Sequence, residues 1–164
     1  MGRGWTKTKE KKIMSLSLEI KHYKDCSLDE FHDIISLRIE IFSVEQEVFY
    51  NDLDGYDKDS YHLIGRDLSG KIIATARILK PGAKYDKAAF GRVVIDKPSR
   101  GNGYGHEMVK FMNNFITEKF PKAGCKISAM LYLKSFYETH GYVKTSGVYP
   151  DCGIDHIDME ANLS

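Results

Sequence analysis

The chain has 164 residues, a length typical of one domain with a substantial buried core. Hydrophobic residues make up 42% of it and charged residues 29%, as in an ordinary globular protein, and the formal net charge is +1. This balance gives no general attraction to nucleic acid or to anionic membranes, and no apolar run is long enough to span a bilayer. We therefore expect a cytoplasmic protein with no nucleic-acid partner and no stable membrane association.

The three cysteines predict a reducing compartment. Cys26, Cys125 and Cys152 are widely spaced and include no Cys-x-x-Cys pair, which is typical of free thiols rather than of a disulfide framework. Cys152 and His156 are close in sequence, but one such pair does not make a zinc site. We expect no bound metal.

The first 14 residues differ from the rest of the chain. Residues 1–14 are basic and show little periodicity, which indicates a disordered tail or a start codon assigned upstream of Met14. An alternative is acylation of Gly2, because the first six residues fit the loose myristoylation pattern and the lysines would supply a second membrane signal. A single folded domain is expected over residues 15–164.

The first half of that domain mixes strand and helix signals. Residues 16–21 alternate apolar and polar side chains and predict a first strand. Ser27 and Glu30 have the spacing of a capping box, and apolar residues at helical spacing follow as far as Phe42. Residues 45–57 are acidic and aromatic, and by default predict a solvated loop.

The second half continues the alternation. Residues 61–66 and 71–79 flank a Ser-Gly turn and predict a β-hairpin, with a loop at 81–87. The later elements are expected to be a central strand around Val93 to Ile95, a helix after Gly105, a strand at 125–130, a short helix at 134–140 ended by Gly141, and two closing strands at 142–149 and 156–160. This order favours an α+β domain with a central, mostly antiparallel sheet.

The most informative stretch runs from residue 90 to residue 109. Its β-branched run predicts a buried strand, glycines follow at positions 101, 103 and 105, and apolar residues then recur at helical spacing. In a strand, glycine-rich turn and helix, backbone N–H groups and the helix N-terminus converge on an anion. Glycines let phosphate oxygens approach the backbone. We therefore expect a phosphorylated ligand here.

Three other arrangements could account for these glycines. A P-loop is excluded, because no Lys-Ser or Lys-Thr pair follows them. A dinucleotide fingerprint fits poorly, because the spacing is Gly-x-Gly-x-Gly and a charged turn containing Pro98 intervenes. A glycine-rich loop that caps a helix without any ligand stays open as the third.

Blocks spread over most of the chain resemble one family. Arg100-x-x-Gly103-x-Gly105 resembles the acetyl-CoA pyrophosphate motif of the Gcn5-related N-acetyltransferase (GNAT) superfamily. The blocks that resemble its ElaA-like branch, in the same order, are residues 37–46, 50–54, His62, 90–105, Phe136-Tyr137 and 153–156. The resemblance implies the GNAT fold, a mostly antiparallel mixed sheet flanked by helices in which strands four and five splay apart around CoA. It also implies acetyl transfer from acetyl-CoA by direct attack of a primary amine.

The resemblance implies roles for particular residues. The expected cofactor-binding residues are Val93, Val94, Ile95, Arg100, Gly101, Asn102, Gly103, Tyr104, Gly105 and His106. Tyr137 would be the general acid that protonates the departing thiolate, since a phenol with a pKa of about 10 is protonated at neutral pH. A structural core tyrosine is the alternative. The candidates for the base are Glu45, His62, Asp155 and His156, of which His156 has the most suitable intrinsic pKa; a hydrogen-bonded structural histidine is the alternative. Glu45, His62 and Asp155 are also expected to bind the acceptor.

At some positions the chain departs from the family pattern, and at others the role of the residue is open. Asp155 stands where the ElaA-like pattern has proline, and Leu131-Tyr132-Leu133 stands where many members carry a pantetheine-binding asparagine. Arg38 and Arg92 lie at resembling positions and would serve equally well as structural ion-pair partners.

The expected acceptor is a small-molecule amine, such as an amino sugar or its phosphate, a polyamine or an amino acid. No covalent acyl-enzyme is expected, because no cysteine lies in a recognisable nucleophile setting. The alternatives are an acetyltransferase acting on protein N-termini or lysines, and a non-catalytic acyl-CoA-binding regulatory domain on the same fold. The resemblance also allows a homodimer.

Overall fold

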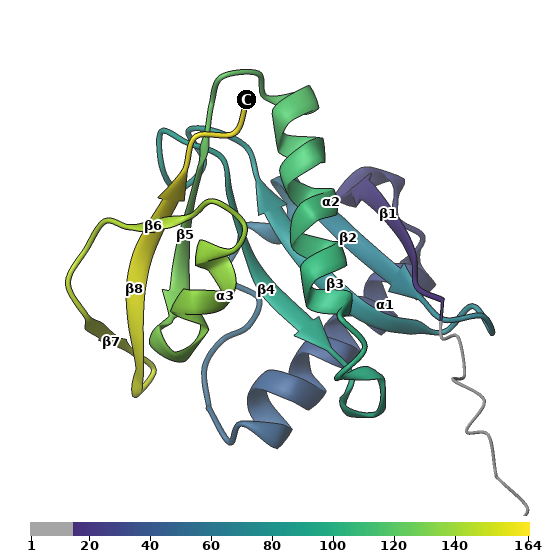
Figure 1. Ribbon diagram of the computed structural model, residues 1–164. Coiled ribbons are helices and arrows are strands. Elements are labelled where there is room, and N and C mark those ends of the chain that lie inside the picture. The colour runs from purple at the N-terminus through teal and green to yellow at the C-terminus, as the bar shows by residue number, and fades with distance from the viewer. Residues whose placement is uncertain (1–14) are drawn as a thin grey trace, which may run out of the picture.

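The computed structural model describes residues 15–164. The predictions for residues 1–14, a disordered tail or an acylated Gly2, lie outside the described residues. A helix layer covers each face of a central β layer, with α2 (Tyr104–Lys119) in front and α1 (Leu28–Ile39) behind in the view of Figure 1. The α+β architecture predicted from the order of the elements is confirmed. Among the described residues, no helix has the length and apolarity that crossing a membrane requires.

The first sheet is antiparallel and has four strands. Their order is β1 (Ser17–His22), β2 (Tyr61–Arg66), β3 (Ile72–Leu79) and β4 (Ala89–Ile95). Strand β3 is buried along its whole length, because α1 and α2 cover its two faces. The hairpin predicted around the Ser-Gly turn is confirmed as β2–β3.

The second sheet contains β5 (Cys125–Met130), β8 (Ile154–Ala161) and β6 (Val143–Lys144) in that order, with β7 (Tyr149–Asp151) also pairing with β8. The prediction of one strand over 142–149 is wrong, because that stretch breaks into β6 and β7. Cys152 and Gly153, with φ of 49° and 78°, form the tight turn between β7 and β8. Asp155 continues β8 where the family pattern has proline.

Strands β4 and β5 meet only at their beginnings. A single parallel bridge joins Ala88 to Cys125, and the Lys126 N–H donates to the Ala88 carbonyl at 2.8 Å. Beyond this bridge the two strands belong to different sheets and diverge (Figure 1). The expected splay of strands four and five is therefore confirmed.

Helix α1 begins as its sequence predicts. The Ser27 hydroxyl accepts from the Glu30 N–H at 3.0 Å, and the Glu30 carboxylate accepts from the Ser27 N–H at 2.9 Å, which completes the capping box. Its buried side chains pack against β2, β3 and β4. The chain then continues as a π-helix over Glu40–Glu45, a rare conformation that frequently occurs at functional sites.

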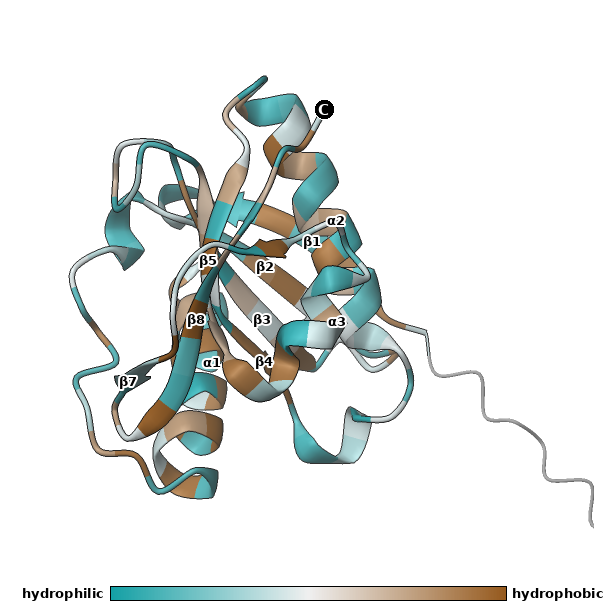
Figure 2. Cartoon of the chain, turned by 60° about the vertical axis from the view of Figure 1, so that its left-hand side comes forward, coloured by the Kyte–Doolittle hydropathy of each residue, from teal (hydrophilic) through white to brown (hydrophobic). Residues whose placement is uncertain are grey.

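Helix α2 and the short α3 (Lys134–Glu138) cover the other face. The apolar stripe predicted for α2 packs on the sheets, with Met108, Val109, Met112 and Ile116 fully buried. Figure 2 shows apolar segments of the strands beneath these helices. Gly141, with φ of 86°, ends the region of α3, and the Tyr142 N–H donates to the Tyr137 carbonyl at 3.2 Å.

Residues 45–57 form a largely exposed loop, as expected, but two of its carboxylates are buried. Asp52 and Asp57 are only 7% and 4% exposed, and both pair with Arg38 on α1, which is 1% exposed. Arg38 Nε lies 2.8 Å from Asp52 Oδ2, although without the angle of a hydrogen bond, and Nη1 donates to Asp57 Oδ1 at 2.6 Å. Buried carboxylates need such partners. The prediction of a solvated loop therefore holds for most of the segment and fails at Asp52 and Asp57. Of the two roles open to Arg38, the structure shows the structural ion pair.

Candidate active site

The glycine-rich turn joins the end of β4 to α2. Gly101 and Gly103 have φ of 80° and 78°, a left-handed conformation that favours glycine, and no heavy atom lies within 4 Å of a Cβ built at either position. Gly103 is the N-cap of α2, so the first N–H groups of the helix, including that of His106, have no intrahelical acceptor. The turn thus offers open backbone donors at the positive end of a helix, a geometry that fits a phosphate.

Two further contacts brace the turn. The Asn102 side chain donates to the Ser99 carbonyl at 2.8 Å. A Cβ built at Gly105 would lie 3.4 Å from the Phe136 ring, an ordinary van der Waals contact, so α2 and α3 pack against each other here.

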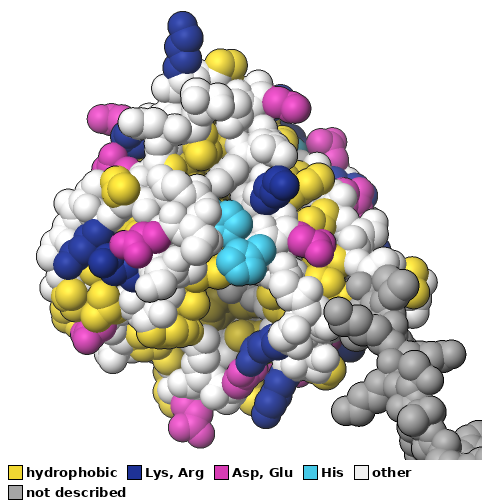
Figure 3. All heavy atoms as spheres, viewed as in Figure 1, with side chains coloured by type: hydrophobic (Ala, Val, Ile, Leu, Met, Phe, Trp, Pro, Cys, Tyr) yellow, Lys and Arg dark blue, Asp and Glu magenta, His cyan; other side chains and the backbone are white. Residues whose placement is uncertain are grey.

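A histidine pair lies where α2 and α3 meet. Histidine side chains gather near the middle of the face in Figure 3, and Nδ1 of His106 is 2.9 Å from Nε2 of His140. The Phe136 ring lies beside both, with centroids 4.6 and 5.3 Å away. Burial, and then the charge of His106, lower the pKa of His140, which is therefore neutral at neutral pH. The pair holds the first turn of α2 against the end of α3.

Arg100 links the turn to the π-helix. Its guanidinium donates two hydrogen bonds to Glu45, at 2.6 and 2.9 Å, and its Nε donates to the Ile95 carbonyl at 3.0 Å. The hydrogen bond from Arg100 is the main reason why the pKa of Glu45 is lowered. The structure thus brings a residue predicted for the acceptor side, Glu45, to a residue predicted for the phosphate. A phosphate would share Arg100 with Glu45 or displace it.

Strand β4 contains a bulge next to the splayed region. Gly91 pairs with Arg77 and Val94 with Thr75, so the single residue between Thr75 and Arg77 faces two residues of β4. One of the two, Arg92, has φ of 51°, unusual for a residue with a side chain. Bulges of this kind redirect backbone groups and are common beside active sites.

The side chain of Arg92 is held by residues 45–57, here called the acidic segment. Nε donates to Asp52 at 2.9 Å, Nη2 donates to Asp54 at 3.2 Å, and the guanidinium lies 5.2 Å from the centre of the Tyr50 ring. These contacts confirm the structural pairing expected for Arg92. Of the β4 residues predicted to bind the cofactor, Val94 packs towards α1, whereas Val93 and Ile95 pack on the α2 side.

Tyr137 belongs to α3, and its ring faces β4. It is 6% exposed and contacts the rings of Phe90, Phe136 and Tyr142, with centroids 6.1, 5.0 and 6.0 Å away. Burial raises its pKa to about 12. Within residues 15–164 its hydroxyl makes no hydrogen bond, although buried tyrosines usually find a partner. The phenolic proton is therefore retained at neutral pH and is not committed to any described side chain.

The second sheet presents a polar face on the side opposite Tyr137. Cys125, Ile127 and Ala129 point into the core, so Ser128 and its neighbours on β5 point the other way. Asp158 on β8 pairs directly with Ser128, and the Tyr149 hydroxyl donates to Asp158 at 2.6 Å and also bonds to Ser128. Sequence reasoning missed this cluster. Its signal was the alternation of polar and apolar residues along 125–130 and 156–161.

His156 lies on the same polar face. It is 9% exposed, its ring stacks on that of Tyr149 with centroids 6.2 Å apart, and its Nδ1 is 2.7 Å from the Ile154 carbonyl. A carbonyl only accepts hydrogen bonds, so Nδ1 carries the proton and Nε2 of the neutral ring has a free lone pair. No described side chain bonds to Nε2. This arrangement suits a general base.

The other predicted acceptor residues lie apart from each other. His62 is fully buried, its Nε2 is 3.1 Å from the Asp57 carbonyl, and burial is the main cause that lowers its pKa. It lies inside the protein beneath the acidic segment, so contact with a substrate would require it to become exposed. Asp155 is exposed, but it precedes His156 directly on β8, so the two side chains point to opposite faces of the sheet. Within the described range, no group of three His, Cys, Asp or Glu side chains is arranged to hold a metal ion.

The family of the chain follows from comparison with known proteins. A family model described as an acetyltransferase (GNAT) domain matches residues 21–163. A UPF0039 protein of Synechocystis is 36% identical over 146 residues, which cover 89% of this chain and 95% of that protein. Protein ElaA of Escherichia coli is 30% identical over 140 residues, or 84% of this chain and 91% of ElaA.

Solved structures of related proteins have the same fold. The crystal structure of an acyl-CoA N-acyltransferase from Pseudomonas aeruginosa superposes with a TM-score of 0.86 at 32% identity, over 90% of this chain and 99% of that one. E. coli ElaA superposes with a TM-score of 0.84 at 28% identity, with the same coverage of 90% and 99%. The chain therefore has the GNAT fold and belongs to the GNAT acetyltransferase family, whose members use acyl-CoA.

Proposed function

We propose that the protein transfers an acetyl group from acetyl-CoA to the primary amine of a small molecule. One observation carries the proposal: a proton donor and a proton acceptor lie on opposite faces of the second sheet, beside the opening between β4 and β5. Tyr137 belongs to the core on the α2 side, whereas His156 lies on the polar side. Transfer from a thioester to an amine needs one group of each kind.

The turn between β4 and α2 holds the pyrophosphate. The N–H groups at the start of α2 and the open space over Gly101 and Gly103 accommodate phosphate oxygens, and Arg100 adds a planar, doubly donating cation. Residues of β4 after the bulge align the chain that carries the thioester. Bound acetyl-CoA supplies an activated carbonyl carbon and a sulfur leaving group.

The protein then manages two protons. His156 Nε2 takes a proton from the ammonium of the acceptor, and the resulting amine attacks the carbonyl carbon. A carbon–nitrogen bond forms as the carbon–sulfur bond breaks, Tyr137 gives its phenolic proton to the departing sulfur, and the nitrogen loses its second proton to water. Water later returns a proton to Tyr137 and takes one from His156. No covalent acyl-enzyme is involved.

The acceptor approaches the polar face of the second sheet. The partly buried carboxylate of Asp158 there favours a cationic amine. Arg92, Lys126 and Tyr149 lie on the same side and limit the shape of what binds. These features support an amine as the acceptor and leave its remaining groups to experiment.

The test is a panel of primary amines assayed for thiol release with acetyl-CoA and with longer acyl-CoA thioesters. We expect amine-dependent release of CoA, fastest with the acetyl thioester, and a product heavier by one acetyl group in mass spectrometry. Faster turnover with longer thioesters would contradict acetyl specificity. CoA binding by calorimetry without release for any amine would instead support a regulatory acyl-CoA-binding domain. Acetylation of peptides but of no small amine would support a protein acetyltransferase.

A further inference from the structure

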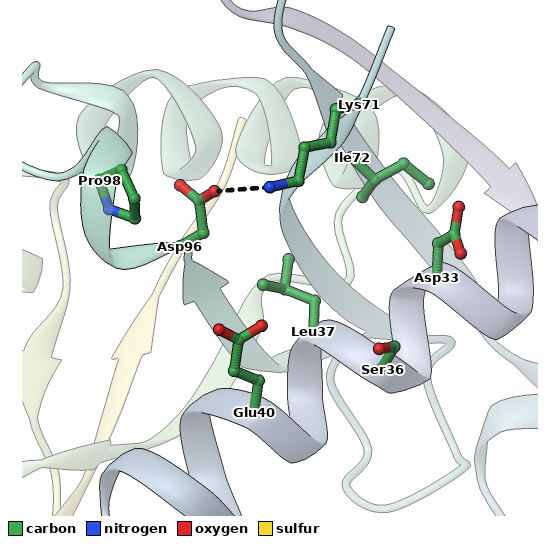
Figure 4. Close-up of a pocket in the computed structure, with 8 residues that line it drawn as sticks. All are labelled: Asp33, Ser36, Leu37, Glu40, Lys71, Ile72, Asp96 and Pro98. Atoms are coloured by element: carbon green, nitrogen blue, oxygen red, sulfur yellow. Dashed lines mark ion pairs between the residues drawn. The ribbon is translucent and has the colours of Figure 1, made fainter.

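A pocket lies outside the proposed acetyl-transfer site. It has a volume of about 280 Å³ and is formed by α1, the beginning of β3 and the residues between β4 and the glycine-rich turn (Figure 4). None of its lining residues belongs to the second sheet, so it is distinct from the face that carries His156. Its size suits a small molecule rather than a nucleotide.

One wall of the pocket is formed by α1 and by the first residue of the π-helix that follows it. Asp33, Leu37 and Glu40 are spaced four and three residues apart, so their side chains lie in a row on the helix. At 1.5 Å per residue, Asp33 and Glu40 are about 10 Å apart along the axis. The pocket therefore has a carboxylate towards each end and apolar Leu37 between them, with Ile72 opposite (Figure 4).

Asp96 supplies the observation that points to a ligand. It lines the pocket and is only 8% exposed, yet its carboxylate accepts no hydrogen bond from residues 15–164, and Oδ1 is completely enclosed. The nearest cation, Lys71, is 3.8 Å from Oδ2, beyond hydrogen-bonding distance, and its side chain is 70% exposed. A buried carboxylate without a hydrogen bond is costly, and an exposed lysine at this distance offsets little of that cost.

We propose that this pocket binds a small organic cation, an aliphatic amine with an ammonium group at each end. Asp96, through Oδ2, and Glu40 receive one ammonium. Asp33, whose Oδ1 lies 3.1 Å from Nδ1 of the exposed His32, receives the other, and the alkyl chain packs on Leu37. The three carboxylates and the single ammonium of Lys71 give the walls a formal charge of −2, which the ligand neutralises. A metal ion does not fit, because no three ligating side chains converge in the described chain. The proposal does not depend on the transferase reaction.

The experiment is isothermal titration calorimetry on the full-length protein without CoA, with putrescine and spermidine as probes. Butylamine, which has one ammonium group, and sodium chloride at matched ionic strength serve as control ligands. We expect saturable binding of the two polyamines and at least several-fold weaker binding of butylamine. Asp96→Asn and Glu40→Gln should each weaken polyamine binding about tenfold or more, because a hydrogen bond to a charged group is lost.

Glu118→Gln is the matched control, since it removes one exposed carboxylate from α2, far from the pocket in sequence and on the other face. It should bind polyamines as the wild type does, and circular dichroism should show all variants folded. Absence of saturable binding, or equal weakening in Glu118→Gln, would overturn the proposal. Binding unchanged in both Asp96→Asn and Glu40→Gln would also overturn it by placing the amine elsewhere, and would leave the proposed transferase intact.

Discussion

Tyr137 and Tyr142 are neighbours, with ring centroids 6.0 Å apart, but their hydroxyl groups have different surroundings. Burial raises the pKa of both phenols, so both are protonated at neutral pH. The Tyr142 hydroxyl donates to Asn113 Oδ1 at 2.7 Å, whereas that of Tyr137 has no partner among the described side chains. A proton already held in a hydrogen bond is a structural one. The proton of Tyr137 is the one available for transfer.

Glu45 and Arg100 give a prediction at the same scale. Because the side chain of Arg100 is 40% exposed and that of Glu45 is 35% exposed, their ion pair contributes about 0–1 kcal/mol. If phosphate displaces Glu45, Glu45→Gln should raise the affinity for CoA by up to about fivefold, whereas Arg100→Gln should lower it. Calorimetry with CoA measures both. A lower affinity in Glu45→Gln would show instead that Glu45 positions Arg100 for the phosphate.

At the level of elements, the turn before α2 depends on the conformation of Gly103. We predict that Gly103→Glu abolishes CoA binding, because the new side chain brings a negative charge to the proposed phosphate position. Gly70→Glu is a matched control, since Gly70 has a similar φ of 88° in the β2–β3 turn and also has open space around it. Both variants should lose about 1–2 kcal/mol of stability from backbone strain. Equal CoA affinity in the two variants would contradict the pyrophosphate assignment.

The start of α1 gives a pH-dependent prediction. The hydrogen bond from Lys21 is the main cause that lowers the pKa of Glu30 from 4.5 to about 2, with burial opposing it and the Ser27 N–H and Arg66 assisting. A carboxylate with a lowered pKa stabilises the fold above its unfolded pKa, and this contribution is lost as pH falls towards the folded value. The window therefore lies between about pH 5 and about pH 2.

Glu30→Gln keeps a side chain that can complete the capping box and removes only the charge. We expect it to cost about 1 kcal/mol at neutral pH after allowance for solvent screening. The difference from the wild type should shrink as pH falls through this window, as measured by urea unfolding at each pH. A difference that stays constant down to about pH 2 would contradict the assigned role of Glu30.

What sequence could predict at this scale depended on how local the interactions were. The capping box at Ser27, the β2–β3 turn and the apolar stripe of α2 each depend on residues that are near one another in sequence. All three predictions are confirmed. The burial of Asp52 and Asp57 in residues 45–57 could not be predicted from neighbouring residues. The partners of this segment, Arg38, Arg77 and Arg92, come from three other elements, and only the fold brings them together.

The site shows the same division. Local patterns and the family resemblance identified the glycine turn, Tyr137 and His156. The pairing of Glu45 with Arg100 joins residues 55 positions apart, and the cluster of Tyr149 with Ser128 depends on strand register across β5, β8 and β7. The bulge at Arg92 depends on the register between β3 and β4, which alternation alone does not specify.

At the scale of the whole molecule, Arg38 connects the stability of the fold to the geometry of the candidate site. It ties α1 to the acidic segment, which in turn holds Arg92 and the bulge of β4. We predict that Arg38→Met lowers the free energy of unfolding by about 3–5 kcal/mol, because Asp52 and Asp57 lose the buried cation between them and keep only Arg92 and Arg77, respectively, as partners. Urea unfolding measures it, with Lys110→Met on the exposed side of α2 as a control expected within about 0.5 kcal/mol of the wild type. A loss below about 1 kcal/mol in Arg38→Met would show that other groups hold the segment.

The splayed sheets organise the chemistry of the molecule. The bridge at Ala88 and Cys125 holds β4 and β5 together at one end only, so the two strands open towards α3 and the glycine turn. Tyr137 lies on one side of this opening and His156 on the other. The central claim is that an acyl donor and an amine meet there, with Tyr137 as the general acid.

The most direct test compares Tyr137→Phe with Tyr142→Phe by steady-state kinetics and CoA calorimetry. We predict that Tyr137→Phe lowers kcat by about 100-fold or more with CoA affinity almost unchanged. Tyr142→Phe should mainly lose about 1–3 kcal/mol of stability, because Asn113 loses its partner, and should keep most of its kcat at a temperature where it is folded. Full turnover in Tyr137→Phe, or an equal loss of kcat in the two folded variants, would contradict the account.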